Sequence, residues 1–137
     1  MRRNEPVSKI MTASPITVHS GQPLSEVQAL MSEHRCHHMP VVSGPDLVGM
    51  VSSTDLLRVT YAWGQDSRNA EAVLDHTHKI EDVMQPGLVT ISPKTTIREA
   101  AGIFAKNWFH ALPVVEGGKL VGIITTTDLL NYLLDQY

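Results

Sequence analysis

The sequence predicts an α/β fold in which one structural unit is used twice. Residues 11–57 align with residues 84–130 without a gap, and 15 of the 47 aligned pairs are identical. Within each copy, short runs rich in β-branched residues precede segments whose apolar residues recur every three or four positions, as expected for strands and helices. A repeat of this length is a folding unit, so the two copies are expected to pack as a pseudo-symmetric pair.

Each copy is expected to begin with a short strand and a helix. The strand covers residues 16–18 in copy one, and residues 89–91 repeat it in copy two. The following helix carries apolar side chains on one face, which indicates packing against a core. These side chains are Leu24, Val27, Leu30 and Met31 in copy one, and Ile97, Ala100, Ala101 and Phe104 in copy two.

A hairpin and a closing helix complete each copy. In copy one, residues 39–42 and 47–51 flank a turn at residues 44–45, and Gly117-Gly118 marks the equivalent turn of copy two. The continuous apolar runs of these strands indicate burial on both faces. The closing helices are expected to start near residues 53–54 and 126–127. A stripe of Leu129, Leu130, Leu133 and Leu134 is predicted to be buried.

The composition is that of a globular protein, with 137 residues, 42% of them apolar and 18% charged. A net charge of −3 gives no argument for nucleic-acid or membrane-surface binding, and no apolar run is long enough to span a membrane. A polar start without a signal peptide, and Cys36 as the only cysteine, favour the cytoplasm. We expect a loose N-terminal arm at residues 1–8, copy one at 9–63, a linker at 64–79 with a short helix over 70–74, and copy two at 80–137.

Short motifs recur at the same place in both copies. Each copy closes with the signature Gly-x-x-Ser/Thr-x-x-Asp, at residues 49–55 and 122–128. Further matching motifs are the openings at residues 9–12 and 82–84 and the runs at residues 38–42 and 111–115. Together with the strand–helix–hairpin–helix order, these motifs resemble the CBS domain, named for cystathionine β-synthase. The resemblance covers all of the chain except its ends and the linker.

This resemblance implies a Bateman module, in which two CBS motifs, each strand-helix-strand-strand-helix, pack through their sheets and leave two clefts between them. In that family the clefts commonly bind adenosine compounds such as AMP, ADP, ATP or S-adenosylmethionine. Members usually regulate another activity and seldom catalyse one, so no enzyme activity and no required cofactor are expected. Modules often pair, which implies a homodimer and a regulated partner protein of unknown identity.

The residues themselves also favour a nucleotide site. Asp55 and Asp128 fall in the first turn of the closing helices, where the helix dipole favours a carboxylate. The two oxygens of a carboxylate can accept hydrogen bonds from the vicinal hydroxyls of a ribose. Ser52 and Thr125, three residues earlier, add hydroxyl groups, and the amides of a helix N-terminus suit a phosphate.

The family resemblance implies which residues line the two clefts. The first cleft would comprise Ser14, Ile16, Cys36, His37, His110, Thr125 and Asp128. The second cleft would comprise Ser52, Asp55, Gly87, Val89, Phe109, His110 and His37. The aspartates would hold the ribose, the two histidines would face the phosphates, and Phe109 would press on the base where the first cleft has only Cys36. The scarcity of Lys and Arg near these positions favours AMP over ATP.

Four other interpretations compete with this one. Thr54 and Thr127 could simply cap the closing helices, with each aspartate only complementing the dipole. The cluster at residues 34–38, with three histidines and Cys36, could hold a metal, although the spacing of these residues spans a helix end and a strand start. Catalysis lacks a nucleophile–base motif. Finally, the chain could be a ligand-free interaction scaffold, docking through Tyr61, Trp63, Leu133, Leu134 and Tyr137 if these side chains are exposed and not part of the core.

Overall fold

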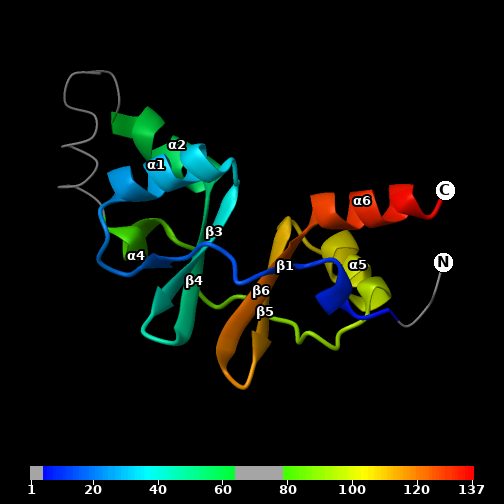
Figure 1. The fold of residues 1–137 in the computed structure, drawn as a ribbon. Helices are drawn as coiled ribbons and strands as arrows, with labels where there is room; N and C mark the ends of the chain where they lie inside the picture. The colour runs from blue at the N-terminus through cyan, green and yellow to red at the C-terminus, as the bar shows by residue number, and fades with distance from the viewer. Residues whose placement is uncertain (1–4, 64–78) are drawn as a thin grey trace. The chain divides into compact units, whose positions relative to one another are not determined.

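The computed structural model describes residues 5–63 and 79–137 as a mixed α/β chain (Figure 1). Its contacts divide the chain into two compact units. The first unit is Ile16–Gly87, which contains most of copy one. The second unit joins Met1–Pro15 to Leu88–Tyr137, which contains most of copy two.

The first unit is a three-stranded sheet with helices packed against it. Its strands are β2 (Val18–His19), β3 (His38–Ser43) and β4 (Asp46–Ser52), and its helices are α1 (Leu24–His34), α2 (Ser53–Trp63) and α4 (Ile80–Val83). Strand β3 pairs in parallel with β2 and antiparallel with β4. Helix α2 packs against α1, α4 and β4, so these elements enclose one hydrophobic core. Its fully buried side chains are Val18, Leu24, Val27, Met39, Val41, Val51 and Ile80.

The second unit repeats this plan. It contains the 3₁₀ turn η1 (Val7–Lys9), strands β1 (Thr12–Ala13), β5 (Ala111–Glu116) and β6 (Lys119–Thr125), and helices α5 (Ile97–Lys106) and α6 (Thr126–Asp135). Strand β6 pairs antiparallel with both β1 and β5. The expected strand at residues 89–91 is reduced to a single parallel bridge between Ile91 and Val114, at the positions where Val18 pairs with Val41 in copy one.

The segment that opens each copy packs into the unit built mainly by the other copy. Thr12 pairs with Ile123 in the second unit, and at the equivalent repeat positions Gln85 pairs with Met50 in the first unit. In Figure 1 the blue N-terminal segment accordingly runs beside β6. The expectation of a loose arm is wrong for residues 5–8, because Val7 is completely buried and its amide donates to the Thr95 carbonyl at 2.8 Å.

Two glycines allow these opening segments to approach the strands closely. A Cβ on Gly122 would lie 2.5 Å from Met11 Sδ and 3.1 Å from the Thr12 carbonyl oxygen. A Cβ on Gly49 would lie 2.5 Å from Met84 Sδ. The glycine of the Gly-x-x-Ser/Thr-x-x-Asp signature is therefore required by close packing.

The structure confirms the helices, the hairpins and the starts of the closing helices, but the predicted leucine stripe is wrong. Helix α6 contains no fully buried residue, and Leu130 and Leu134 are 59% and 70% exposed. Only Leu129 and Tyr132 of this helix pack against the core of the second unit. Helix α6 thus packs on the core of its unit through a narrow face, and its other leucine side chains are exposed to solvent. The short helix expected over residues 70–74 lies outside the described residues.

Candidate functional site

The closing helix of copy one begins with a reciprocal pair of hydrogen bonds between a serine and an aspartate. The Ser52 amide donates to Asp55 Oδ2 at 3.0 Å, and the Asp55 amide donates to Ser52 Oγ at 3.1 Å. This capping-box arrangement satisfies amides that have no partner inside the helix. Asp55 is buried, with 9% of its surface exposed.

Copy two builds the same arrangement from Thr125 and Asp128. The Thr125 amide donates to Asp128 Oδ2 at 2.8 Å, and the Asp128 amide donates to Thr125 Oγ1 at 3.3 Å. The Thr125 hydroxyl also lies 3.1 Å from Asp128 Oδ2. The capping residues are therefore Ser52 and Thr125, and the structure leaves Thr54 and Thr127 exposed.

Each aspartate keeps one carboxylate oxygen available. In both copies Oδ2 accepts the hydrogen bonds from the capping residue, whereas Oδ1 accepts none from the part of the chain that the structure describes. A fixed carboxylate with a spare oxygen is suited to accept a hydrogen bond from a ligand hydroxyl. Capping and ligand binding are thus compatible roles for the same side chain.

A histidine lies next to each capping box. The Ser53 amide donates to the His37 carbonyl at 2.8 Å, and the Thr126 amide donates to the His110 carbonyl at 3.0 Å. In copy one, Ser53 Oγ lies 3.4 Å from His37 Nδ1. Both histidine side chains are exposed. Each unit therefore brings together one predicted histidine and one predicted aspartate by the same backbone connection.

The other predicted cleft residues are distributed over the two units. The first unit holds Ile16, Cys36 and Gly87, and the second unit holds Ser14, Val89 and Phe109. Ser14 and Gly87, which occupy equivalent positions, both have a positive φ, of 49° and 64°. Each predicted cleft draws residues from both units, so the two cleft assignments stay predictions.

The first unit also contains a pocket that the sequence did not reveal. It has a volume of about 400 Å³ and lies between α1 and α2. Its walls include Cys36 and His37, which were predicted as site residues, and Gln28, Ser32 and Leu57, which were not. Burial raises the pKa of the Cys36 thiol above its ordinary value of 9.0, although a hydrogen bond from its own backbone lowers this pKa in part.

Copy two has aromatic rings at two of the equivalent positions. Phe104 and Phe109 stand at the positions of Met31 and Cys36, and their rings pack edge to face with centroids 6.3 Å apart. The pocket thus lies at positions where the two copies differ in side-chain size and chemistry. The signal in the sequence was the replacement of two phenylalanines by a thioether and a thiol.

Neither a metal-binding cluster nor a membrane-crossing helix is found in the described residues. Over residues 5–63 and 79–137, no group of three or more His, Cys, Asp or Glu side chains is placed to hold a metal ion. Across the same ranges, no helix combines the length and the apolar character that a membrane crossing requires.

Comparison with known proteins identifies relatives for both copies. A family model described as CBS domain matches residues 7–61 and again residues 80–135. The CBS domain-containing protein YhcV of Bacillus subtilis is 30% identical over 123 residues, which cover 90% of this chain and 81% of YhcV. Other relatives are longer proteins, and this chain spans 47%, 32% and 21% of three of them.

Two solved structures have the same fold and contain adenosine compounds. CBSX2, a protein from Arabidopsis thaliana, was solved in complex with AMP; it is 26% identical, with a TM-score of 0.79 over 96% of this chain and 98% of that chain. The CBS domain pair of protein MJ0100 was solved in complex with 5′-methylthioadenosine and S-adenosyl-L-methionine. That pair is 25% identical, with a TM-score of 0.76 over 93% of this chain and 98% of that chain.

Proposed function

Because this chain belongs to the CBS domain family, we propose that it is a regulatory module that binds an adenosine ligand. The observation that carries the proposal is the repeated aspartate of the capping boxes. Asp55 and Asp128 are each fixed by backbone amides, keep one oxygen for a ligand and lie beside a histidine. Adenosine compounds in the related CBSX2 and MJ0100 structures support the ligand class.

In this proposal each aspartate accepts hydrogen bonds from a ribose. Asp128 and Thr125 act in one cleft together with Ser14, Ile16 and Cys36, and Asp55 and Ser52 act in the other together with Gly87, Val89 and Phe109. We assign His37 and His110 to the phosphate of either ligand, because the carbonyl of each accepts a hydrogen bond from the first residue of its closing helix, beside the aspartate. An imidazole N–H can donate a hydrogen bond to a phosphate oxygen.

We propose AMP as the preferred ligand, with ADP, ATP and S-adenosylmethionine as competitors. Arg35 and Arg58 are the cationic side chains closest in sequence to the predicted cleft residues of copy one, and both are exposed. A single phosphate needs less positive charge than a triphosphate, so the sparse cations favour the monophosphate.

The proposed role is regulatory and not catalytic. A ligand that contacts residues of both copies changes their relative arrangement only if it binds one arrangement more tightly than the other. That change is then transmitted to a partner protein, in the cytoplasm, by a module that associates with a second copy of itself.

The proposal is tested with a variant that removes both carboxylate charges, Asp55→Asn with Asp128→Asn. A thermal-shift series with AMP, ADP, ATP and S-adenosylmethionine should raise the melting temperature of the wild-type chain. At 100 times its Kd, a ligand adds about 2.7 kcal/mol of stability, which is a shift of several degrees. The double variant should bind at least about tenfold more weakly, because charge-assisted hydrogen bonds are lost.

Asp82→Asn is the matched control for this experiment. Asp82 forms the same kind of capping contact, with the Lys79 amide donating to its Oδ2 at 3.1 Å, but it is not a predicted cleft residue. The control should lose stability without losing ligand affinity. Equal affinity in the double variant and the wild type would refute the assignment of the aspartates.

The scaffold interpretation remains the second candidate because of one observation, the exposed apolar side chains of the second unit. Trp108, Leu134 and Tyr137 are 97%, 70% and 96% exposed. A module that serves only to bind a protein needs such a surface but no ligand. The absence of a thermal shift with every adenosine compound would favour this second function.

A further inference from the structure

Trp108 is the most exposed large apolar side chain that the structure describes, with 97% of its surface accessible. Tryptophan side chains are usually mostly buried, and at protein interfaces they often carry a large share of the binding energy. Trp108 lies just beyond the end of α5, and Ala101 and Ala105 precede it on exposed positions of that helix. Helix α5 ends at Lys106 and the backbone is extended at Asn107, so Trp108 projects from the loop that follows the helix.

The pocket of the first unit occupies the equivalent place in the other copy. Gln28, Ser32 and Arg35 line it at the positions that Ala101, Ala105 and Trp108 hold in copy two. At these positions copy one presents a mostly apolar hollow edged by three polar side chains, and copy two presents two small side chains and an exposed ring. At these three repeat positions, copy one lines a pocket and copy two carries an exposed ring that such a pocket could receive.

The chemistry of the pocket suits an indole. The Arg35 guanidinium can lie over an aromatic face in a cation–π contact. The side chains of Gln28 and Ser32 each offer an oxygen that can accept the indole N–H. Met31 and Leu57 supply apolar contact for the ring. At about 400 Å³, the pocket is within the size range of sites that hold small organic groups.

Charge supports pairing between unlike copies. Glu33 and Lys106 occupy equivalent repeat positions, next to the pocket and next to the tryptophan, and both side chains are exposed. Copy one facing copy two of another chain places these opposite charges near each other. Copy one facing copy one would instead place Glu33 near Glu33 and Arg35 near Arg35, which is electrostatically unfavourable.

We propose that Trp108 of one chain inserts into the α1–α2 pocket of a second copy of this chain, so that copy one of each chain faces copy two of the other. The contact is reciprocal, as a twofold dimer requires, and it occurs twice in each dimer. This inference rests on the self-association included in the proposed function, and it specifies the contact and the orientation. Because Cys36 and His37 line this pocket and are also assigned to the proposed clefts, self-association is measured without nucleotide.

The first experiment measures self-association of the full chain by sedimentation equilibrium. The wild-type chain should be a dimer at micromolar concentration, and Trp108→Ala should raise the dimer Kd by at least about tenfold. Tyr137→Ala is the matched control, because it removes an equally exposed aromatic side chain that the pocket does not receive, and it should leave the Kd unchanged. Both substituted side chains are almost fully exposed, so both variants should retain the circular dichroism spectrum of the wild type.

A charge exchange tests the orientation. Glu33→Lys and Lys106→Glu should each weaken the dimer, and the two changes in one chain should restore it. Pairing of like copies predicts that neither the single changes nor the double change alters the dimer, because each copy faces an identical charge in every variant. A wild-type dimer that Trp108→Ala leaves intact, or one that the double exchange fails to restore, overturns the proposed contact.

The native Cys36 gives a second, local readout. The thiol lines the pocket, so the partner's ring should slow its alkylation by a maleimide in the wild-type dimer. Trp108→Ala should alkylate several-fold faster, whereas Tyr137→Ala should match the wild type. Equal rates in all three chains would exclude Trp108 from the pocket.

These outcomes separate this inference from the proposed function. A monomeric wild-type chain refutes both the contact and the self-association. Normal AMP binding by Trp108→Ala with loss of the dimer supports the contact and the nucleotide site independently. An intact, Trp108-dependent dimer that binds no adenosine compound refutes the ligand proposal and retains the contact.

Discussion

Cys36 is chemically the most distinctive residue of the described pocket. Its pKa is raised because burial disfavours the thiolate, and this effect is larger than the opposite effect of its backbone hydrogen bond. The thiol form consequently dominates at neutral pH, which argues for a packing role for Cys36 and against a nucleophilic one.

The pH dependence of alkylation tests this view. In the Trp108→Ala variant, where the proposed partner does not cover the pocket, the alkylation rate of Cys36 should rise with pH to a midpoint above 9.0. The sign follows from the thiolate being the reactive species, since a raised pKa shifts its formation to higher pH. A short cysteine peptide serves as the control. A midpoint below that of the peptide would contradict the assignment.

A single added methyl group should distinguish a glycine that is needed for packing from one that is not. Gly122→Ala introduces a Cβ within 2.5 Å of Met11 Sδ and should lower the free energy of unfolding by about 1–3 kcal/mol. Gly102, inside α5, has no atom within 4 Å of the position that a Cβ would take, so Gly102→Ala should raise stability by about 0.5–1 kcal/mol. Urea unfolding of the two variants measures both values. Equal stability changes would show that the opening segment does not press on β6.

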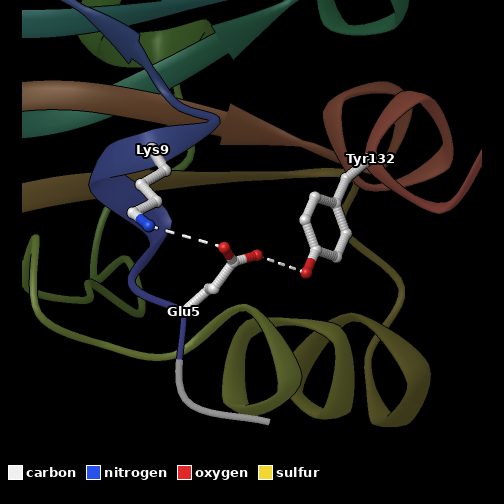
Figure 2. Close-up of polar contacts among 3 residues, drawn as sticks. All are labelled: Glu5, Lys9 and Tyr132. Carbon is white, nitrogen blue, oxygen red and sulfur yellow. Dashed lines mark hydrogen bonds and ion pairs between the residues drawn. The ribbon is translucent and has the colours of Figure 1, made fainter. Parts of the chain in front are cut away.

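At the scale of elements, the N-terminal segment is tied to α6 by side chains as well as by its backbone. Figure 2 shows the Glu5 carboxylate between Lys9 and Tyr132, with the Tyr132 hydroxyl donating to one oxygen and Lys9 Nζ lying 3.4 Å from the other. The tyrosine contact is partly buried, whereas the lysine is 56% exposed. The two contacts to one carboxylate are therefore expected to differ in strength.

Tyr132→Phe should lower the free energy of unfolding by about 1.5 kcal/mol, because a partly buried hydrogen bond to a charged group is lost. Lys9→Met should change it by less than about 0.5 kcal/mol, because exposed ion pairs contribute little. Hydrogen exchange at the Val7 amide, which donates to the Thr95 carbonyl, reports the anchoring of the segment directly. Faster exchange in the lysine variant than in the tyrosine variant would reverse this ranking.

The elements were predictable from the sequence to the extent that local pattern determines them. Helices α1 and α5, both hairpins and the starts of α2 and α6 follow from apolar periodicity and turn residues, and the signature aspartates were expected in the first helical turn. Pattern does not say which neighbour an element contacts, so Leu130 was predicted to be buried and is 59% exposed. The same limit applies to β1, whose pairing with β6 joins residues more than 100 positions apart.

The aspartates of the candidate site could be predicted, because the same residue type recurs in both copies. The pocket could not, because it depends on how much space the packed side chains leave. Asp55 and Asp128 stand out because the same residue type recurs in the same signature. Met31 and Cys36 line the pocket at the positions where copy two has the packed rings of Phe104 and Phe109, and its volume is defined only once the helices are in place. Aligning the two copies identifies these differences in residue type, but it does not reveal the pocket between α1 and α2.

At the scale of the whole molecule, removal of the first residues should damage the far end of the chain. Deletion of residues 1–13 removes β1 and the buried Val7 from the second unit. Amides of residues 111–135 should then exchange faster, while those of β3 and β4 keep their protection, because the first unit begins at Ile16. Hydrogen-exchange mass spectrometry measures this distribution.

The control for this deletion is removal of the exposed residues 136–137 at the other terminus, which should change neither unit. Loss of protection mainly in β3 and β4 after the N-terminal deletion would contradict the division of the chain into these two units.

The placement of the opening segments also bears on how such a chain could arise by gene duplication. An ancestor with a single copy would have had no second copy in its own chain to receive its opening segment, since here each segment pairs with a strand of the other copy. Two ancestral chains would have completed each other by exchanging these segments. Fusion of the two genes would turn an exchange between molecules into one within a single chain, with the gain in effective concentration that a covalent link provides.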